Sequence, residues 1–362
     1  MRLHRLLGPA LLALLPWTAR AGEPPPADDG VHVVLCFSGG GTRAAAFALG
    51  AARGLAEVDA GGAPLLERVD RVIGVSGGSL TAAQVAIDRS PEALARFERE
   101  VLRDDMELAM VKAAASDGFS LLFRDLTRCD VAASCFDRRI LGTSFAALPA
   151  RPELWVQTTD VKERRPLVLS RASLEALGLD PAEVPVARAL AASAAFPGVF
   201  PPLRLEAGGE GPVLHLADGG IVDNLGLEPE LETPLPPGTR AMVLVVVNAR
   251  GALLVGEDTL TSSLRSGLHA LELQQRRLDD LHLSRARDRL RLLELEARLA
   301  GRALSTRLVL IDFSGSPRQA ELDPIGTRFA LDEEEVSLLL EEGQAIARER
   351  AACAVEAWPV AR

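Results

Sequence analysis

The sequence predicts an α/β protein in which helices cover both faces of a mostly parallel sheet. Strand-like apolar runs alternate with helical runs through most of the chain, which is the order that a parallel sheet requires. The run from Ala241 to Asn248 is continuously apolar, as is typical of a central parallel strand. A chain of 362 residues with 48% hydrophobic residues is also long enough to bury a sizeable core.

The expected elements follow one another in this alternating order. Strands are expected at 31–37, 69–75, 154–159, 165–170, 213–217, 241–248 and 307–313. Helices are expected at 42–58, 79–87, 91–111 and 184–195, and a capping box at 332–335 predicts a last helix to about residue 350. The segment 259–300 departs from this rhythm. Its leucines at helical spacing predict one or two long helices, packed on the domain or serving as a lid or a dimer seam.

The N-terminus has the order of residues that marks a secretory signal. A basic start is followed by a short apolar run and by the small-residue cleavage site Ala19-Arg20-Ala21. We therefore expect a signal peptide at 1–21, a flexible leader at 22–30, one domain at 31–352 that contains the 259–300 insertion, and a tail at 353–362. The mature protein is expected to be exported, either periplasmic or secreted.

Composition removes several classes of function. The formal charge of −10 becomes −13 without Arg2, Arg5 and Arg20, and an acidic surface disfavours nucleic acid. The chain has no tyrosine and only two lysines, which disfavours Tyr-Lys and Ser-Lys mechanisms. No cysteine or histidine spacing predicts a metal site. In an oxidising compartment the likeliest disulfide joins Cys129 to Cys135 across a short polar loop, and Cys36 is expected to be a buried hydrophobe.

Two glycine clusters carry the chemistry. Ser76, in Gly74-Val75-Ser76-Gly77-Gly78, lies between a predicted strand and a predicted helix, which is the setting of a nucleophile elbow. The run Gly39-Gly40-Gly41 follows the first strand and opens a helix, so its backbone N–H groups can bind an oxyanion. The same run, read as Gly39-x-Gly41-x-x-Ala44, is also a dinucleotide fingerprint, but that fingerprint needs an acid at the end of the next strand. Asp59 precedes that strand, and the strand ends in the elbow.

The candidate base is Asp218, in Asp218-Gly219-Gly220 at the end of a short predicted strand. Sheets of this class place their ligands at the carboxyl ends of strands. An ordinary Asp-Gly turn is the plainer interpretation. His215 lies three residues earlier, on the opposite face of a regular strand, and is expected to be a core histidine.

Taken in order, four blocks resemble those of the patatin-like phospholipases: Gly39-Gly40-Gly41-Thr42-Arg43, Gly74-Val75-Ser76-Gly77-Gly78, Ala192 to Pro202, and Asp218-Gly219-Gly220. The resemblance implies a three-layer α/β/α patatin-like fold and a Ser-Asp dyad of Ser76 and Asp218 without histidine. It also implies an oxyanion hole at Gly39, Gly40 and Gly41, and substrate contacts from Arg43, Gly77 and Pro197. The family usually has glycine after the arginine, where this chain has Ala44.

From this resemblance we expect a serine hydrolase that cleaves acyl lipids, with phospholipid as substrate and contact with a membrane surface. No metal or organic cofactor is implied, and the oligomeric state is left open. The alternatives are a non-catalytic lipid-binding or interaction protein on the same fold, and the dinucleotide-binding enzyme.

The first testable prediction is signal cleavage after Ala21. Mature protein should begin at Gly22, because a signal peptidase recognises small residues at the positions of Ala19 and Ala21. N-terminal sequencing of exported protein checks this, and exported material that begins at Met1 would contradict it.

Overall fold

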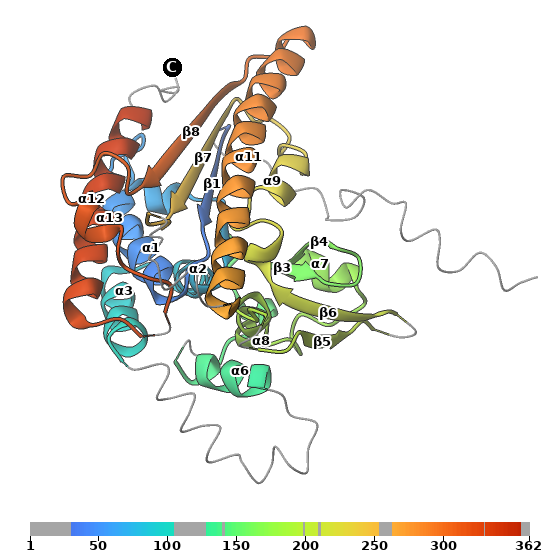
Figure 1. Ribbon diagram of the computed structural model, residues 1–362. Helices are drawn as coiled ribbons and strands as arrows, with labels where there is room; N and C mark the ends of the chain where they lie inside the picture. The colour runs from blue at the N-terminus through green and yellow to red at the C-terminus, as the bar shows by residue number, and fades with distance from the viewer. Residues whose placement is uncertain are drawn as a thin grey trace, which may run out of the picture.

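The computed structural model describes residues 30–104, 128–139, 142–197, 200–208, 211–252, 263–328 and 330–355. These residues build eight strands into a single sheet with helices on both faces (Figure 1). The strands are β1 (Val31–Phe37), β2 (Arg71–Val75), β3 (Glu153–Asp160), β4 (Arg165–Leu169), β5 (Leu203–Glu206), β6 (Val213–Asp218), β7 (Ala241–Asn248) and β8 (Ser305–Asp312).

The sheet has the strand order β5-β6-β3-β2-β1-β7-β8. The five strands from β3 to β8 along this order are parallel to their neighbours. The antiparallel pairs lie at one end, where β3 pairs with β4 and β6, and β6 pairs with β5. The predicted α/β class and the mostly parallel sheet are confirmed, and β7 is a fully buried central strand as its apolar run predicts.

One face of the sheet is covered by most of the helices. These are α1 (Gly41–Ala56), α2 (Gly77–Ile87), α3 (Pro91–Phe97), α6 (Arg128–Arg139), α8 (Val186–Ser193) and α13 (Glu333–Val355), with the short helices α7 (Arg171–Ala176) and α12 (Gln319–Leu322) and a π-helical turn at Glu98–Leu102. Alternate residues of the central strands, among them Leu35, Val72 and Val245, join these helices in the larger core.

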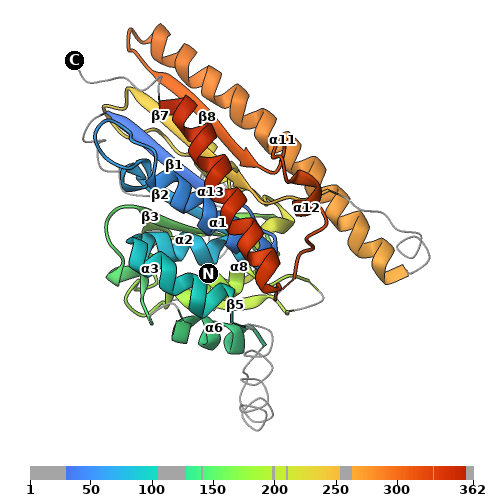
Figure 2. The same cartoon turned by 90° about the vertical axis from the view of Figure 1, so that its left-hand side faces the viewer.

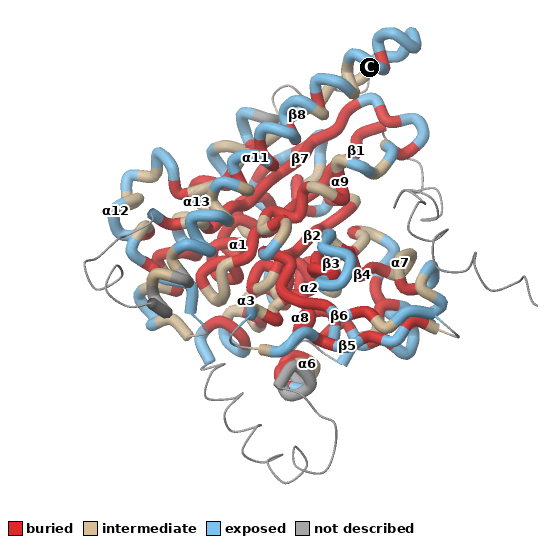
Figure 3. Tube along the Cα trace, turned by 45° about the vertical axis from the view of Figure 1, so that its right-hand side comes forward, coloured by how far each residue is buried: buried red, intermediate tan, exposed pale blue. Residues whose placement is uncertain are grey.

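The opposite face is covered by α11 (Ser263–Leu299) and α9 (Glu228–Glu232). Here the neighbouring strand residues Cys36, Ile73 and Val246 pack against Leu283 and Leu290 of α11 in a second core. The chain therefore has three layers, and Figure 3 shows the central strands as its most buried part. Cys36 is fully buried as predicted, and burial raises the pKa of its thiol well above the usual range.

The closest helix contact in the larger core is the crossing of α1 and α13 (Figure 2). A Cβ added at Gly50 would lie 2.3 Å from the Leu340 carbonyl oxygen, and one at Gly54 would lie 2.3 Å from that of Gln344. From the other side, a Cβ at Gly343 would lie 2.5 Å from the Phe47 carbonyl oxygen. Only glycine permits this approach, which fixes α13 against the helix that follows β1.

The amino-terminal edge of the parallel strands is closed by a buried ionic network. Arg71 forms ion pairs with Glu230 at 2.6 Å and with Glu153 at 2.9 Å, and its guanidinium stacks 3.9 Å from the Trp155 ring. His32 lies 3.8 Å from Glu230 in the same network. Burial alone would raise the pKa of Glu230, but Arg71 and His32 outweigh it, so this carboxyl stays ionised.

Several elements differ from the sequence-based expectation. Cys129 and Cys135 belong to α6 and not to a loop. Residues six apart on a helix are separated by about 9 Å along its axis, which exceeds the Cα separation that a disulfide spans, so the predicted pairing is wrong. The helix expected at 91–111 ends its regular part at Phe97. The α13 helix opens with the predicted capping box, in which Asp332 and Glu335 exchange hydrogen bonds, and it continues to Val355.

The predicted signal peptide at 1–21 and all but the last residue of the leader predicted at 22–30 lie outside the described residues. In the described part of the chain, no helix is both long enough and apolar enough to cross a membrane.

The crossing of α1 and α13 yields a stability prediction. Gly50→Ala should lower the free energy of unfolding by about 1–3 kcal/mol, because the new methyl group overpacks the crossing, even though alanine favours a helix by about 1 kcal/mol. Gly326→Ala is the matched control, since no heavy atom lies within 4 Å of its added Cβ. It should change stability by no more than about 0.5 kcal/mol. Urea denaturation measures both variants, and equal stabilities would refute the tight crossing.

Candidate active site

Ser76 occupies a sharp turn between β2 and α2. Its backbone has φ 49° and ψ −125°, a conformation that a side chain larger than glycine rarely adopts. Such strain persists only where the surrounding structure enforces it. The turn presents the half-buried hydroxyl at the N-terminus of α2, where the helix dipole favours negative charge.

Strand register brings Asp218 next to Ser76. Val75, the last residue of β2, pairs with Gln157 of β3, and Asp218 pairs with the next residue, Thr158. One edge of β3 pairs with β4. The opposite edge pairs first with β2 and then, beyond the end of β2, with β6. Asp218 thus reaches the predicted carboxyl edge of the sheet, but on an antiparallel strand.

The two side chains are joined by a short hydrogen bond. The Ser76 hydroxyl donates to Oδ2 of Asp218 at 2.7 Å, and the Gly220 N–H donates to Oδ1 at 2.8 Å. The Thr159 hydroxyl donates to the Asp218 backbone carbonyl at 2.8 Å. Burial raises the pKa of Asp218 to about 6, although the hydrogen bonds from Ser76 and Gly220 lower it. Among the described residues no cation offsets the burial, so this carboxylate is more basic than an exposed one.

Ser193 holds the backbone of the elbow in place. Its hydroxyl accepts a hydrogen bond from the Ser76 N–H at 2.8 Å and donates to the Gln157 carbonyl at 2.6 Å. The hydroxyl therefore bridges β2 and β3 at the point where their ladder stops. Ser193 is not among the residues predicted for the site, and the signal that could have identified it is a lone hydroxyl that ends α8 after a run of buried apolar residues.

The glycine loop after β1 supplies two backbone donors. The N–H groups of Gly40 and Gly41 have no hydrogen-bond acceptor within the described residues. Gly39 differs, because its N–H donates to the Asn224 carbonyl at 3.0 Å. Gly39 therefore anchors the loop and, contrary to the prediction, does not offer a free donor to an oxyanion.

The glycine loop and the elbow touch through their backbones. A Cβ added at Gly77 would lie 2.0 Å from the Gly41 carbonyl oxygen. On its other side, Gly41 has φ +63°, and a Cβ there would lie 2.6 Å from the Arg328 carbonyl oxygen. The Thr42 N–H also donates to that carbonyl at 2.9 Å. The glycine loop is thus packed between two backbone segments, the one that follows α12 and the one at Gly77.

The two other residues predicted to contact substrate lie in different settings. Arg43 is buried, and its Nη1 donates to the Ile325 carbonyl at 2.7 Å, so its guanidinium makes a backbone contact. Burial lowers the pKa of Arg43 to about 10, although nearby Glu272 raises it. Pro197 is exposed in the turn that follows α8.

None of the described histidines bonds to Ser76 or Asp218. His32 lies in the network at the amino edge, and His282 lies 3.2 Å from Asp223 and 3.8 Å from Glu228. His215 is exposed on the opposite face of β6 from Asp218, so the expectation of a core histidine is wrong. His269 is half-buried on α11.

The dinucleotide alternative does not fit this geometry. The acid that it needs, Asp59, is exposed in a turn before β2, where its carboxylate accepts from the Gly62 N–H. The end of β2 carries Ser76 instead.

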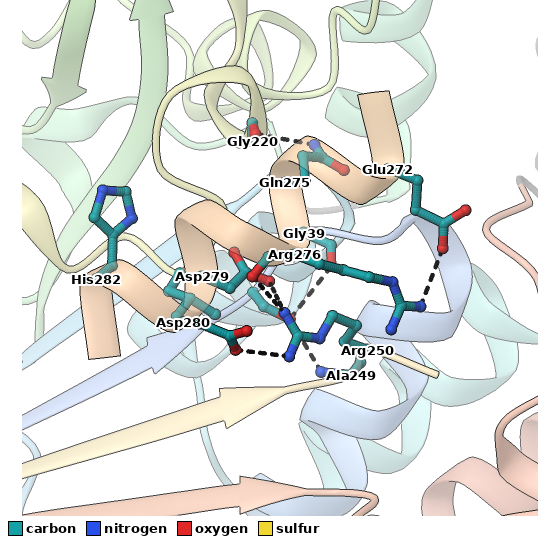
Figure 4. Close-up of polar contacts among 12 residues, drawn as sticks. Gly39, Gly220, Ala249, Arg250, Glu272, Gln275, Arg276, Asp279, Asp280 and His282 are labelled. Carbon is teal, nitrogen blue, oxygen red and sulfur yellow. Dashed lines mark hydrogen bonds and ion pairs between the residues drawn. The ribbon is translucent and has the colours of Figure 1, made fainter. Parts of the chain in front are cut away.

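The inner face of α11 contacts the turn that follows Asp218 (Figure 4). Gln275 Nε2 donates to the Gly220 carbonyl at 2.9 Å. Arg250, just after β7, secures the helix through ion pairs with Asp279 at 3.3 Å and Asp280 at 3.0 Å. Burial raises the pKa of Asp279 to about 7, although Arg250 lowers it. No local sequence pattern marks Gln275, because its contact with Gly220 depends on how α11 packs against the domain.

Comparison with known proteins identifies the sequence pattern. A family model described as patatin-like phospholipase matches residues 35–231, a range that contains Ser76, Asp218 and the glycine loop. No curated protein sequence matches the chain.

Solved structures share the fold at low sequence identity. The human GIVD cytosolic phospholipase A2 superposes with a TM-score of 0.52 and 14% identity, over 91% of this chain and 62% of that chain. The same enzyme bound to a methyl gamma-linolenyl fluorophosphonate inhibitor and terbium chloride superposes with a TM-score of 0.50 and 14% identity, over 91% of this chain and 59% of that chain. VipD from Legionella pneumophila superposes with a TM-score of 0.42 and 14% identity, over 96% of this chain and 73% of that chain. The chain thus spans less than two thirds of the human enzyme.

The buried carboxyl of Asp218 yields a pH prediction. Because its pKa is raised on folding, the folded state binds this proton more tightly than the unfolded state, and stability falls as the pH rises from about 4 to about 6. Asp218→Asn does not titrate, so it should be more stable than the wild type by a wider margin at about pH 7.5 than at about pH 4.5. Thermal unfolding at both pH values measures the margin, and an equal margin would contradict the raised pKa.

Proposed function

Because the chain belongs to the patatin-like phospholipase family, whose model matches more than half of it, we propose that it hydrolyses acyl lipids by a Ser-Asp dyad. Ser76 is the nucleophile and Asp218 is the base. The observation that carries this proposal is the 2.7 Å hydrogen bond between the strained serine and a buried carboxylate that has no cationic partner in the described part of the chain.

In the first step Ser76 Oγ attacks the ester carbonyl while Asp218 accepts the hydroxyl proton. A pKa of about 6 suits this role, because the carboxylate is ionised at neutral pH and still basic enough to accept a proton. The carbonyl oxygen becomes an oxyanion, which the N–H groups of Gly40 and Gly41 stabilise. The proton then passes from Asp218 to the leaving alcohol, and the acyl group remains on Ser76.

In the second step water releases the acyl group. Asp218 accepts a proton from the attacking water, and the same two N–H groups stabilise the second oxyanion. Collapse of this intermediate frees the carboxylic acid and returns the proton to Ser76. Ser193 and Thr159 contribute by holding the backbones of the two catalytic residues in register.

Phospholipid is the proposed substrate class, and it implies contact with a membrane surface. Ile221, in the turn just after Asp218, is 37% exposed and offers an apolar side chain beside the dyad. We also propose export, on the strength of the signal-like order of residues 1–21.

The dyad predicts how single substitutions affect hydrolysis. Ser76→Ala should reduce hydrolysis to background, and Asp218→Asn should lower kcat by about 10²–10⁴-fold, because an amide cannot accept the proton. A fluorophosphonate probe should label Ser76 in the wild type and leave Ser76→Ala unlabelled. Mass-spectrometric analysis of products from mixed phospholipids and short esters measures activity and ester preference together.

Histidine variants are the matched controls. His32, His215, His269 and His282, replaced singly by glutamine, should each keep most of the activity, with thermal unfolding used to identify any loss of fold. A folded histidine variant as inactive as Ser76→Ala would replace the dyad with a triad. Absence of both labelling and hydrolysis in folded wild-type protein would favour the non-catalytic lipid-binding alternative.

A further inference from the structure

The outer face of α11 carries an unpartnered row of leucines. Within the described residues, six of the large hydrophobic side chains with high exposure belong to this one helix: Leu271, Leu273, Leu281, Leu292, Leu295 and Leu299. Four of them, from Leu281 to Leu299, repeat at helical spacing and are 48–81% exposed. Leu283 and Leu290 face the core from the opposite side of the helix. Figure 2 shows α11 along the outside of the molecule.

The row follows the spacing of a coiled-coil seam. With Leu292 and Leu299 at a positions, Leu281 and Leu295 fall at d positions. The two positions in the middle of the seam are charged, with Arg285 at a and Asp288 at d. Both side chains are exposed, at 52% and 65%. Their present ion pairs are long: Arg285 lies 3.6 Å from Glu228, and Asp288 lies 3.5 Å from Arg291. Such exposed pairs contribute little to stability.

We propose that this seam, the a and d positions between residues 274 and 299, joins two copies of the chain in an antiparallel, two-fold dimer. In that arrangement Arg285 of each copy meets Asp288 of the other, and Leu281 of each meets Leu292 of the other. Leu278, which is half-buried at an a position, meets Leu295 in the same register. The surface is therefore complementary to itself, as a two-fold contact requires.

The central charges favour this occupant over others. Opposite charges at the middle of a seam fix its register and direction. Against a lipid surface, Arg285 and Asp288 would interrupt the apolar row at its centre and would lose hydration, with only their long ion pairs to Glu228 and Arg291 as compensation. The helix has 37 residues, which corresponds to about 55 Å, so it offers a long contact. The proposal is independent of the catalytic one.

Charge reversal tests the seam. Sedimentation velocity of the full chain should show a dimer, and Leu292→Asp should make it a monomer. Arg285→Asp and Asp288→Arg should each raise the dissociation constant by about 10–100-fold, because like charges then meet at the centre. The double variant Arg285→Asp/Asp288→Arg should recover the dimer, and so should an equimolar mixture of the two single variants. Leu273→Asp is the control, because Leu273 is exposed on the same helix but lies at neither an a nor a d position.

Four outcomes would overturn the proposal. The first is a monomeric wild type up to about tens of micromolar, the range in which a specific dimer contact holds. The second is a dimer that survives Leu292→Asp. The third is a pair of single variants that fail to recover the dimer together. The last is a monomer that binds phosphatidylcholine–phosphatidylglycerol vesicles through Leu292, which would assign the leucine row to a lipid surface.

Discussion

The backbone contact between Gly41 and Gly77 is the constraint on which the site depends. It requires α1 and α2 to start at the same point above the neighbouring strands β1 and β2, with no side chain between them. On its other side, the glycine loop, which carries the proposed oxyanion donors, packs against the segment at Arg328. That segment leads into α13, which the glycine crossing fixes against α1. The proposed donors and the proposed nucleophile are therefore held in one geometry by packed backbone, which leaves little room for adjustment.

The buried carboxylates show how the fold separates structure from chemistry. Glu230 and Asp218 are both removed from water, and burial alone raises the pKa of each. At the amino edge Arg71 and His32 reverse the effect, and Glu230 is an ordinary partner in an ionic network. At the carboxyl edge no cation of the described residues shifts the pKa of Asp218 back, so the effect of burial remains, as the proposed role of base requires. The same sheet thus stabilises one carboxylate and leaves the other reactive.

A feature could be predicted from the sequence when the residues that determine it lie close together along the chain. Ser76, Asp218 and the glycine loop could be picked out because each lies in a short strand–turn pattern whose backbone demands are local. Other features could not be predicted, because each depends on a partner far along the chain. They are the antiparallel direction of β6, the bridge made by Ser193, the hydrogen bond from the Gly39 N–H to Asn224 and the contact of Gln275 with Gly220. The loop expected around Cys129 and Cys135 failed for another reason, because short polar runs occur on the surfaces of helices as well as in loops.

The origin of the site residues along the chain has a consequence for when activity can first appear. The bond between Ser76 and Asp218 spans 142 positions, and the bond that ties Arg43 to Ile325 spans 282. Contacts of such separation form late, because a long intervening loop must be closed first. A growing chain therefore carries its serine long before it has a base, and it has both before the loop that binds the oxyanion is supported. Under the proposed mechanism, hydrolysis awaits the last tenth of the chain, so incomplete or unfolded copies would leave the lipids around them intact.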